Sequence, residues 1–185
     1  MIAVFSDIHG NLPALTACHA DALARGCRQF LNLGDIVSGP LWPRETADWL
    51  MHRDWPTIAG NHERQLLEQA PAEMGESDRF AHGELDRAHL AWLASHPADL
   101  RWRDDVYLCH ANPRDDLHYL LHRVEPGGAR DARDSEVEAM LDGYAFAAIG
   151  CGHSHQPHNR ALPDGRRVFN PGSGGLPSYE SDMPV

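Results

Sequence analysis

The segment IAVFSDIHGN, residues 2–11, begins with a short apolar run and ends in a polar turn that carries an aspartate and a histidine. Residues 2–5 predict a buried strand, and Asn11-Leu12-Pro13 predicts the start of a helix that continues to Gly26. Asp7 and His9 therefore stand between a strand and a helix. Side chains two positions apart point to the same side of an extended chain, so this pair could hold one metal ion.

The alternation of strand and helix continues through the first 60 residues. Further strands are predicted at 30–33 and 56–59 and a helix at 43–52, which favours a parallel sheet and the α/β class. After residue 60 the pattern predicts helices at 63–70, 77–95 and 137–141, a strand at 145–149, hairpins joining 100–102 to 106–109 and 160–162 to 168–169, and a polar loop at 127–134. The chain has 185 residues, of which 42% are hydrophobic, and we expect residues 1–185 to form one domain.

Metal-capable side chains follow almost every predicted strand. The carboxyl ends of parallel strands meet at one edge of a sheet, where helix N-termini also point, so these side chains should converge. Glycines beside them permit the sharp turns that such convergence needs. One His-x-His pair would be weak evidence, but two similar pairs support each other. The set is Asp7, His9, Asp35, Asn61, His62, His110, His153 and His155.

The order and spacing of these motifs are specific. Asp7-x-His9, Gly34-Asp35-(x)3-Gly39, Gly60-Asn61-His62-Glu63, His110 and Gly152-His153-Ser154-His155 resemble the calcineurin-like metallophosphoesterase family. Asn170-Pro171-Gly172-Ser173 is similar to a turn of its bacterial branch of small phosphodiesterases and diadenosine-tetraphosphatase-like enzymes. The resemblance implies an αββα sandwich of two mixed β-sheets flanked by helices.

The resemblance also implies a ligand set for two divalent ions. Asp7, His9 and His155 would hold one ion, and Asn61, His110 and His153 the other. Asp35 would bridge both, since one carboxylate can span ions about 3.5–4 Å apart. Mixed nitrogen and oxygen ligands suit Mn²⁺, our first choice, or Fe, Zn²⁺ or Ni²⁺ better than Ca²⁺.

The implied activity is hydrolysis of a small phosphodiester or nucleotide by in-line attack of a metal-bridging hydroxide. Asp35 and His62 would be the catalytic residues, with His62 protonating the leaving-group oxygen as general acid. We also expect three substrate contacts in one loop, Arg114, His118 and Tyr119. Arg114 could bind a phosphate bidentately, and Tyr119 could stack on a base.

Two other functions stay open. The motifs around Asp7 and Asn61 resemble protein Ser/Thr phosphatases as well, although Val37-Ser38-Gly39 replaces the Asp-Arg-Gly of that branch. The second alternative is a protein-binding scaffold of the same fold, although no ligand of the pattern is missing. A structural zinc module is disfavoured, because such sites use four ligands that are often cysteines.

The composition excludes several other classes. The net charge is −11 and the 16 basic residues are all arginine, so there is no lysine for a Schiff base or a phosphate loop. The acidic balance argues against extended nucleic-acid binding, and no apolar run approaches the roughly 18–20 residues of a membrane span. We therefore expect a cytoplasmic protein, and the resemblance implies a small phosphorylated substrate. Its four cysteines should be buried, reduced thiols, with a thiolate ligand at Cys109 or Cys151 as a minor alternative.

Two further expectations concern the surface. Histidines outside the motifs should be solvated: His19, His52, His82, His89, His96 and His158. His118 and His122, which stand four positions apart shortly after His110, stay open as exceptions. The resemblance also implies further strands after Asn170, where only 15 residues follow. This shortened C-terminus predicts an exposed sheet edge, covered by a second copy in a homo-oligomer or by residues 174–185 folding back.

Overall fold

The computed structural model describes residues 1–177. Its N-terminal part is a strand, helix and strand unit: β1 (Ile2–Phe5), α1 (Leu12–Ala24) and the parallel strand β2 (Gln29–Asn32). The Asn11 side chain caps α1 by accepting a hydrogen bond from the Ala14 N–H at 3.2 Å. Pro13 lies in the first turn, where backbone N–H groups have no partner within the helix, so its missing N–H costs no hydrogen bond.

The prediction of a strand at 56–59 is wrong. Only Thr57 pairs with Asn32, as an isolated parallel bridge. Pro56 has no N–H for a rung before this bridge, and the Gly60 N–H, which a rung after it would need, donates to Glu63 Oε2 instead. The first sheet is therefore a parallel pair rather than a mixed sheet.

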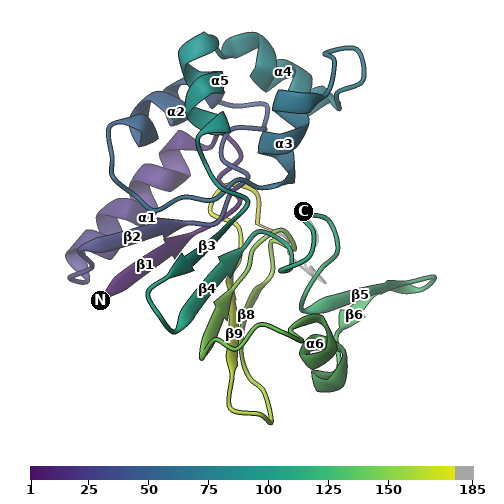
Figure 1. Cartoon of the computed structure of the whole chain (residues 1–185). Coiled ribbons are helices and arrows are strands. Elements are labelled where there is room, and N and C mark those ends of the chain that lie inside the picture. The colour runs from purple at the N-terminus through teal and green to yellow at the C-terminus, as the bar shows by residue number, and fades with distance from the viewer. Residues whose placement is uncertain (178–185) are drawn as a thin grey trace, which may run out of the picture.

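Helices α2 (Pro43–Met51), α3 (Asn61–Glu68), α4 (Glu76–Glu84) and α5 (Arg87–Ala94) gather on one side of the molecule (Figure 1). The single helix predicted over 77–95 is in fact α4 and α5. Asp86 divides them because its carboxylate accepts the N–H groups of Ala88 and His89 and so begins a new helix.

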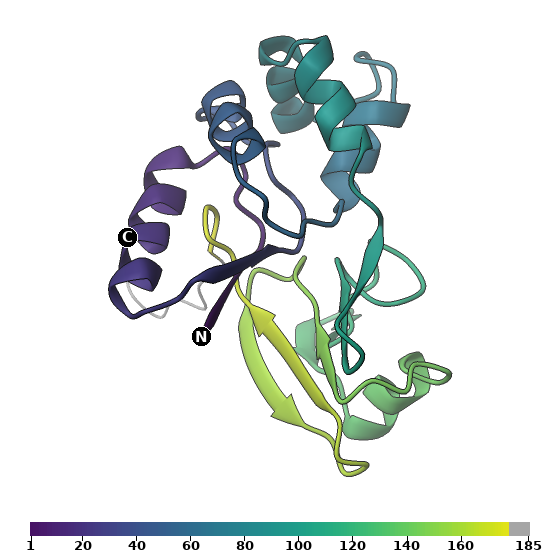
Figure 2. The same cartoon turned by 60° about the vertical axis from the view of Figure 1, so that its left-hand side comes forward.

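The second sheet is mixed and lies beside the first (Figure 2). Its strands are β3 (Asp99–Trp102), β4 (Val106–Cys109), β7 (Ala148–Gly150), β9 (Arg167–Pro171) and β8 (Pro157–Ala161), in that order across the sheet. Leu31 and Ile58 from the first layer pack against Leu108 from β4 in one buried cluster. The predicted sandwich with outer helices is confirmed, with both hairpins in place.

A small hairpin stands where a polar loop is predicted. Strands β5 (His122–Glu125) and β6 (Gly128–Asp131) pair antiparallel around Pro126-Gly127, and α6 (Asp134–Met140) follows. The hairpin shows no alternation of apolar and polar residues, so its periodicity gave no strand signal. Helix α6 buries Val137 against the second sheet, in a cluster that includes Ile149.

Strand β8 forms one edge of the second sheet, and residues of the α6 segment lie beside it. Arg160 on β8 donates to the Ala132 carbonyl and pairs with Asp134. We expected residues 174–185 to fold back over this edge, and for Gly174 and Gly175 that prediction is wrong. Their N–H groups donate instead to the carbonyls of Ser6 and Asp7, in the loop after β1. Residues 178–185 lie outside the described part of the chain.

Several smaller expectations are also decided. Cys27, Cys109 and Cys151 are buried and free as predicted, whereas Cys18 is exposed. Burial raises the pKa of the Cys109 and Cys151 thiols, which disfavours thiolate ligands. His89, which was expected at the surface, is buried, and so is His122, which was left open. Among the described residues, no helix combines the length and apolar character needed to cross a membrane.

Candidate metal centre

Loops that follow β1 and β2 are held together by backbone hydrogen bonds. The Asp7, His9 and Gly10 N–H groups donate to the carbonyls of Gly34, Asp35 and Ile36 at 2.9–3.0 Å. The carboxyl ends of these two strands therefore lie side by side, as expected for a parallel pair. The loop after β7 reaches the same place, because the His153 N–H donates to the Asp7 carboxylate at 3.1 Å.

The backbone at this meeting point is strained. Six non-glycine residues of the described chain have positive φ, and all but Arg103 belong to the predicted ligand set. The left-handed conformation costs such residues roughly 1–2 kcal/mol each. Strain of this kind persists where the surrounding structure enforces it, and it clusters at functional sites. The five strained candidate ligands are Asp7, His9, Asp35, His153 and His155, with φ between 49° and 65°.

The structure brings one group of four side chains together: Asp7, His9, Asp35 and His155. The Nε2 atoms of His9 and His155 are 3.1 Å apart, and His155 Nε2 lies 3.3 Å from an Asp7 carboxylate oxygen. The opposite ring nitrogens, both Nδ1, contact the carbonyls of Ser38 and Leu176 at 2.7 and 2.6 Å. Each Nδ1 must donate there, which leaves Nε2 with the lone pair that a metal ligand needs.

A second group shares Asp35 with the first. It contains Asp35, His110 and His153, and Asn61 lies beside them. His110 Nε2 is 3.2 Å from Asp35 Oδ2 and 3.1 Å from Asn61 Oδ1. The same Asp35 oxygen lies 3.9 Å from His9 Nε2 in the first group. One carboxylate therefore faces both groups.

The donor set fits divalent cations. Asp7 and Asp35 are buried, and within the described chain they have ion pairs only with histidines and none with an arginine. Burial opposes ionisation of Asp35, but the charge of His110 and its hydrogen bond hold the pKa of that carboxyl well below its usual range. Buried carboxylates without a permanent positive partner are costly, and bound cations would compensate them.

His62 lies at the mouth of this centre, at the start of α3. Its N–H donates to Asp35 Oδ1 at 3.1 Å, and its Nδ1 contacts Asp78 Oδ1 at 2.6 Å. Burial lowers the pKa of His62, but the hydrogen bond to Asp78 and the charges of Asp35 and Asp78 outweigh it and raise the pKa to about 9. Asp78 therefore favours the imidazolium and fixes the ring orientation.

Sequence reasoning missed two supporting carboxylates. Glu63 is fully buried, and its oxygens accept the N–H groups of Asp35, Ile36 and Gly60, each at 2.8 Å. It therefore ties the Asp35 loop to the start of α3. Its place two residues after Asn61 was visible in the motif. Asp78 carried no signal, because it comes from α4, 16 residues from His62.

A cavity of about 580 Å³ opens onto the centre. His9, Asp35, His62, Tyr119 and His153 are among the side chains that line it. The Tyr119 ring lies 4.9 Å from the His153 ring, so Tyr119 forms a wall of the cavity beside the second group.

The other two predicted substrate contacts lie outside this cavity. The Arg114 guanidinium donates to the carbonyls of Met140 and Asp142 at 3.3 and 3.2 Å, at the end of α6. His118 is exposed and its Nδ1 contacts Asp115 at 3.0 Å. Both residues line a neighbouring groove that shares Tyr119 with the cavity.

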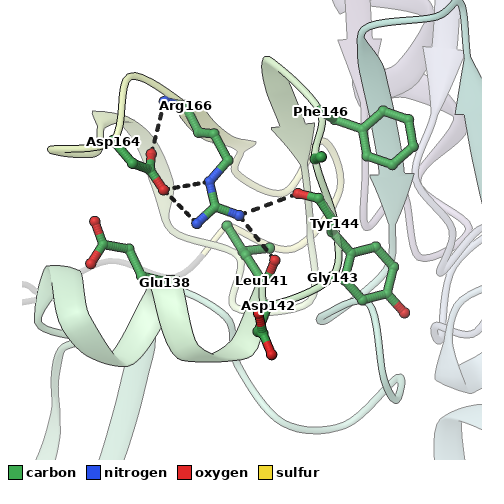
Figure 3. A pocket seen from close by; sticks show the side chains of 9 residues that line it. Glu138, Leu141, Asp142, Gly143, Tyr144, Phe146, Asp164 and Arg166 are labelled. Atoms are coloured by element: carbon green, nitrogen blue, oxygen red, sulfur yellow. Dashed lines mark hydrogen bonds and ion pairs between the residues drawn. The ribbon is translucent and has the colours of Figure 1, made fainter.

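Another pocket lies at the far end of the second sheet, beside α6 (Figure 3). The Arg166 guanidinium is its obvious anion ligand, but that group already pairs with Asp164 and donates to the carbonyls of Leu141 and Tyr144. With its cation engaged, this pocket offers no comparable chemistry.

Comparison with known proteins assigns the family. The family model for calcineurin-like phosphoesterases matches residues 1–157, and the chain belongs to this family. Its site supports a phosphoric ester hydrolase that uses divalent metal ions, as the family does.

Two solved structures share the fold, and one sequence relative matches a shorter stretch. A metallophosphoesterase from Sphaerobacter thermophilus has the same fold with a TM-score of 0.75 and 23% identity, over 95% of this chain and 77% of that one. The phosphoesterase Yfce from E. coli matches with a TM-score of 0.53 and 18% identity, over 97% of this chain and 83% of that one. Uncharacterized protein MJ0912 of Methanocaldococcus jannaschii is 40% identical over 67 residues, which span 36% of this chain and only 28% of that protein.

Proposed function

We propose that the chain is a dinuclear phosphodiesterase-type hydrolase that acts on a small phosphodiester or nucleotide. The observation that carries the proposal is the position of Asp35, whose Oδ2 lies 3.2 Å from His110 Nε2 and 3.9 Å from His9 Nε2. A carboxylate placed between two sets of imidazoles is the arrangement expected of a bridging ligand. Mn²⁺ is the first candidate, and Fe, Zn²⁺ and Ni²⁺ are alternatives.

The proposed ligand assignment follows the two groups. Asp7, His9 and His155 would hold one ion and Asn61, His110 and His153 the other. When bound, the ions would supply positive charge to the phosphoryl oxygens and a water molecule activated for attack on phosphorus. The protein's own part is to keep the imidazoles in the correct tautomer through carbonyl acceptors such as Ser38 and Leu33.

His62 is the proposed proton donor to the leaving group. It lines the cavity, and its Nδ1 is engaged by Asp78, so Nε2 is the nitrogen available to a substrate. Protonation of the departing oxygen would avoid the release of a high-energy alkoxide. The assignment rests on this geometry.

The cavity favours substrates of nucleotide size. Its volume of about 580 Å³ lies within the usual range for small-molecule sites. Tyr119 offers an aromatic face next to His153 on which a base could stack. We therefore expect nucleoside-containing phosphodiesters and dinucleoside polyphosphates to be better substrates than phosphorylated peptides.

A substrate panel tests the proposal. Purified protein is assayed with bis(p-nitrophenyl) phosphate, p-nitrophenyl phosphate, cyclic nucleotides, diadenosine polyphosphates and a phosphoserine peptide, each with Mn²⁺, Ni²⁺, Zn²⁺ or Mg²⁺. The expected result is diesterase activity that Asp35→Asn abolishes. Preferential hydrolysis of the peptide would favour a protein phosphatase. The absence of activity on every substrate with every one of the four metals would favour a scaffold.

A further inference from the structure

A second cluster of metal-capable side chains lies outside the centre described above. It comprises His122, Asp131 and His158, from three different strands. His122 opens β5 and Asp131 ends β6, where the two residues pair across the hairpin. His158 comes from β8, the edge strand of the mixed sheet. The cluster therefore joins the small hairpin to the sheet edge.

The three donor atoms face one another. The Nε2 atoms of His122 and His158 are 3.1 Å apart, and each lies 3.6 Å from Asp131 Oδ1. In a tetrahedral site with metal–ligand bonds of about 2.0–2.1 Å, the ligand atoms lie about 3.3–3.4 Å from one another. The observed separations bracket this value, so one ion could contact all three atoms with small adjustments.

We propose that His122, His158 and Asp131 form a third cation site, which binds a zinc-class divalent ion through Nε2, Nε2 and Oδ1. Two imidazoles and one carboxylate suit Zn²⁺, Co²⁺ or Ni²⁺, whereas Mg²⁺ and Ca²⁺ prefer all-oxygen sites. The exposure pattern leaves room for a water molecule as fourth ligand: the His122 side chain is 4% exposed, His158 23% and Asp131 69%.

The site is separate from the proposed dinuclear centre. None of its three residues lines the cavity that contains His9 and Asp35. Tyr119 lies between the two regions, with its ring centroid 6.1 Å from that of His122 and 4.9 Å from that of His153. The role of the third ion is therefore structural: it would fasten the β5–β6 hairpin to β8.

A hydrogen bond between the two imidazoles is the competing explanation of the same contact. In that case one Nε2 donates to the other, and Asp131 contributes a largely exposed ion pair of little energy. The two explanations differ in metal content, since a hydrogen bond needs no ion. They also differ in the effect of zinc on stability, because an ion that binds only the folded chain must stabilise it.

Metal counting distinguishes them. The full chain is stripped with a chelator, dialysed against Zn²⁺, washed and analysed for zinc per chain, in parallel with His158→Gln, Asp131→Asn and the control His52→Gln. His52 is an exposed histidine at the end of α2 and belongs to none of the metal-capable clusters of the described residues. We expect His158→Gln to hold one zinc fewer than wild type, Asp131→Asn to have weakened occupancy, and His52→Gln to match wild type.

The difference of one ion is independent of the proposed function, because the dinuclear centre is intact in every variant. The Zn²⁺-induced rise in melting temperature should be smaller in His158→Gln than in wild type, while phosphodiesterase activity stays unchanged. Equal zinc content in wild type and His158→Gln would overturn the proposal, as would an equal loss in His52→Gln. Co²⁺ provides a second readout: tetrahedral absorption present in wild type must disappear in His158→Gln.

Discussion

Glu63→Gln should be among the most damaging conservative substitutions in the chain. The Glu63 carboxylate is fully buried and accepts three N–H groups, from Asp35 and Gly60 at one oxygen and from Ile36 at the other. A glutamine oxygen can keep the first two. Its NH2 group then faces the Ile36 N–H, so one bond is lost and two donors oppose each other.

The cost follows from those three contacts. An unpaired buried N–H costs about 1–3 kcal/mol, and two bonds that lose a charged acceptor weaken by about 1 kcal/mol each. Removal of a buried charge offsets part of this, because burial raises the pKa of Glu63. We expect a net loss of about 3 kcal/mol, which corresponds to roughly 6–12 °C in melting temperature.

Thermal unfolding and denaturant titration measure this loss, with Glu68→Gln as the matched control. Glu68 is exposed and lies on the same helix, so its substitution removes the same charge without the three contacts. Metal affinity should also fall about 10–100-fold in Glu63→Gln, as for other residues that orient ligands. A Glu63→Gln protein no less stable than Glu68→Gln would refute the view that this carboxylate joins the two loops.

Three further predictions concern other parts of the chain. His62→Asn should keep the metal content of wild type and lower turnover about 10²–10⁴-fold, measured on bis(p-nitrophenyl) phosphate; an unchanged rate would remove His62 from the mechanism. Gly60→Ala should lose metal and activity, because a Cβ there would lie 2.2 Å from Asp35 Oδ1, whereas Gly83→Ala, with nothing within 4 Å, should not; similar metal contents would contradict this. Burial lowers the pKa of His96 to about 4, below the value of about 6.5 in unfolded chains, so stability is complete above pH 6.5 and declines as the pH falls towards 4. His96→Phe should remove about 1 kcal/mol of that loss of stability, after allowance for the partial exposure of the side chain. An unaltered dependence of stability on pH would count against this role of His96.

The fold and the convergence of the candidate ligands could be predicted because both depend on local order along the chain. Polar candidate ligands come directly after the apolar strands, as Asp7 does after the run that ends at Phe5. The same change from apolar to polar residues therefore predicts both the end of a strand and the position of a candidate ligand. The family and the sandwich are confirmed. The metal-binding roles of these residues stay a prediction.

Features that depend on distant partners could not be predicted. Asp78 reaches His62 from another helix, and nothing near either residue indicates the contact. Arg114 was expected to bind phosphate, but carbonyls at the end of α6 accept its hydrogen bonds.

The cluster of His122, Asp131 and His158 illustrates the same limit. Its residues are 9 and 27 positions apart along the chain, 122 to 131 and 131 to 158, and no motif spacing connects them. The pairing of β5 with β6 and the edge position of β8 bring them together. Tertiary structure was needed to find this site.

The central claim is that Asp35 bridges two ions. Anomalous diffraction from crystals soaked in Mn²⁺ tests it most directly, since each bound ion gives its own peak. The proposed centre predicts two peaks about 3.5–4 Å apart, one on each side of the Asp35 carboxylate. A single peak, or a pair of peaks that Asp35 does not touch, would contradict it.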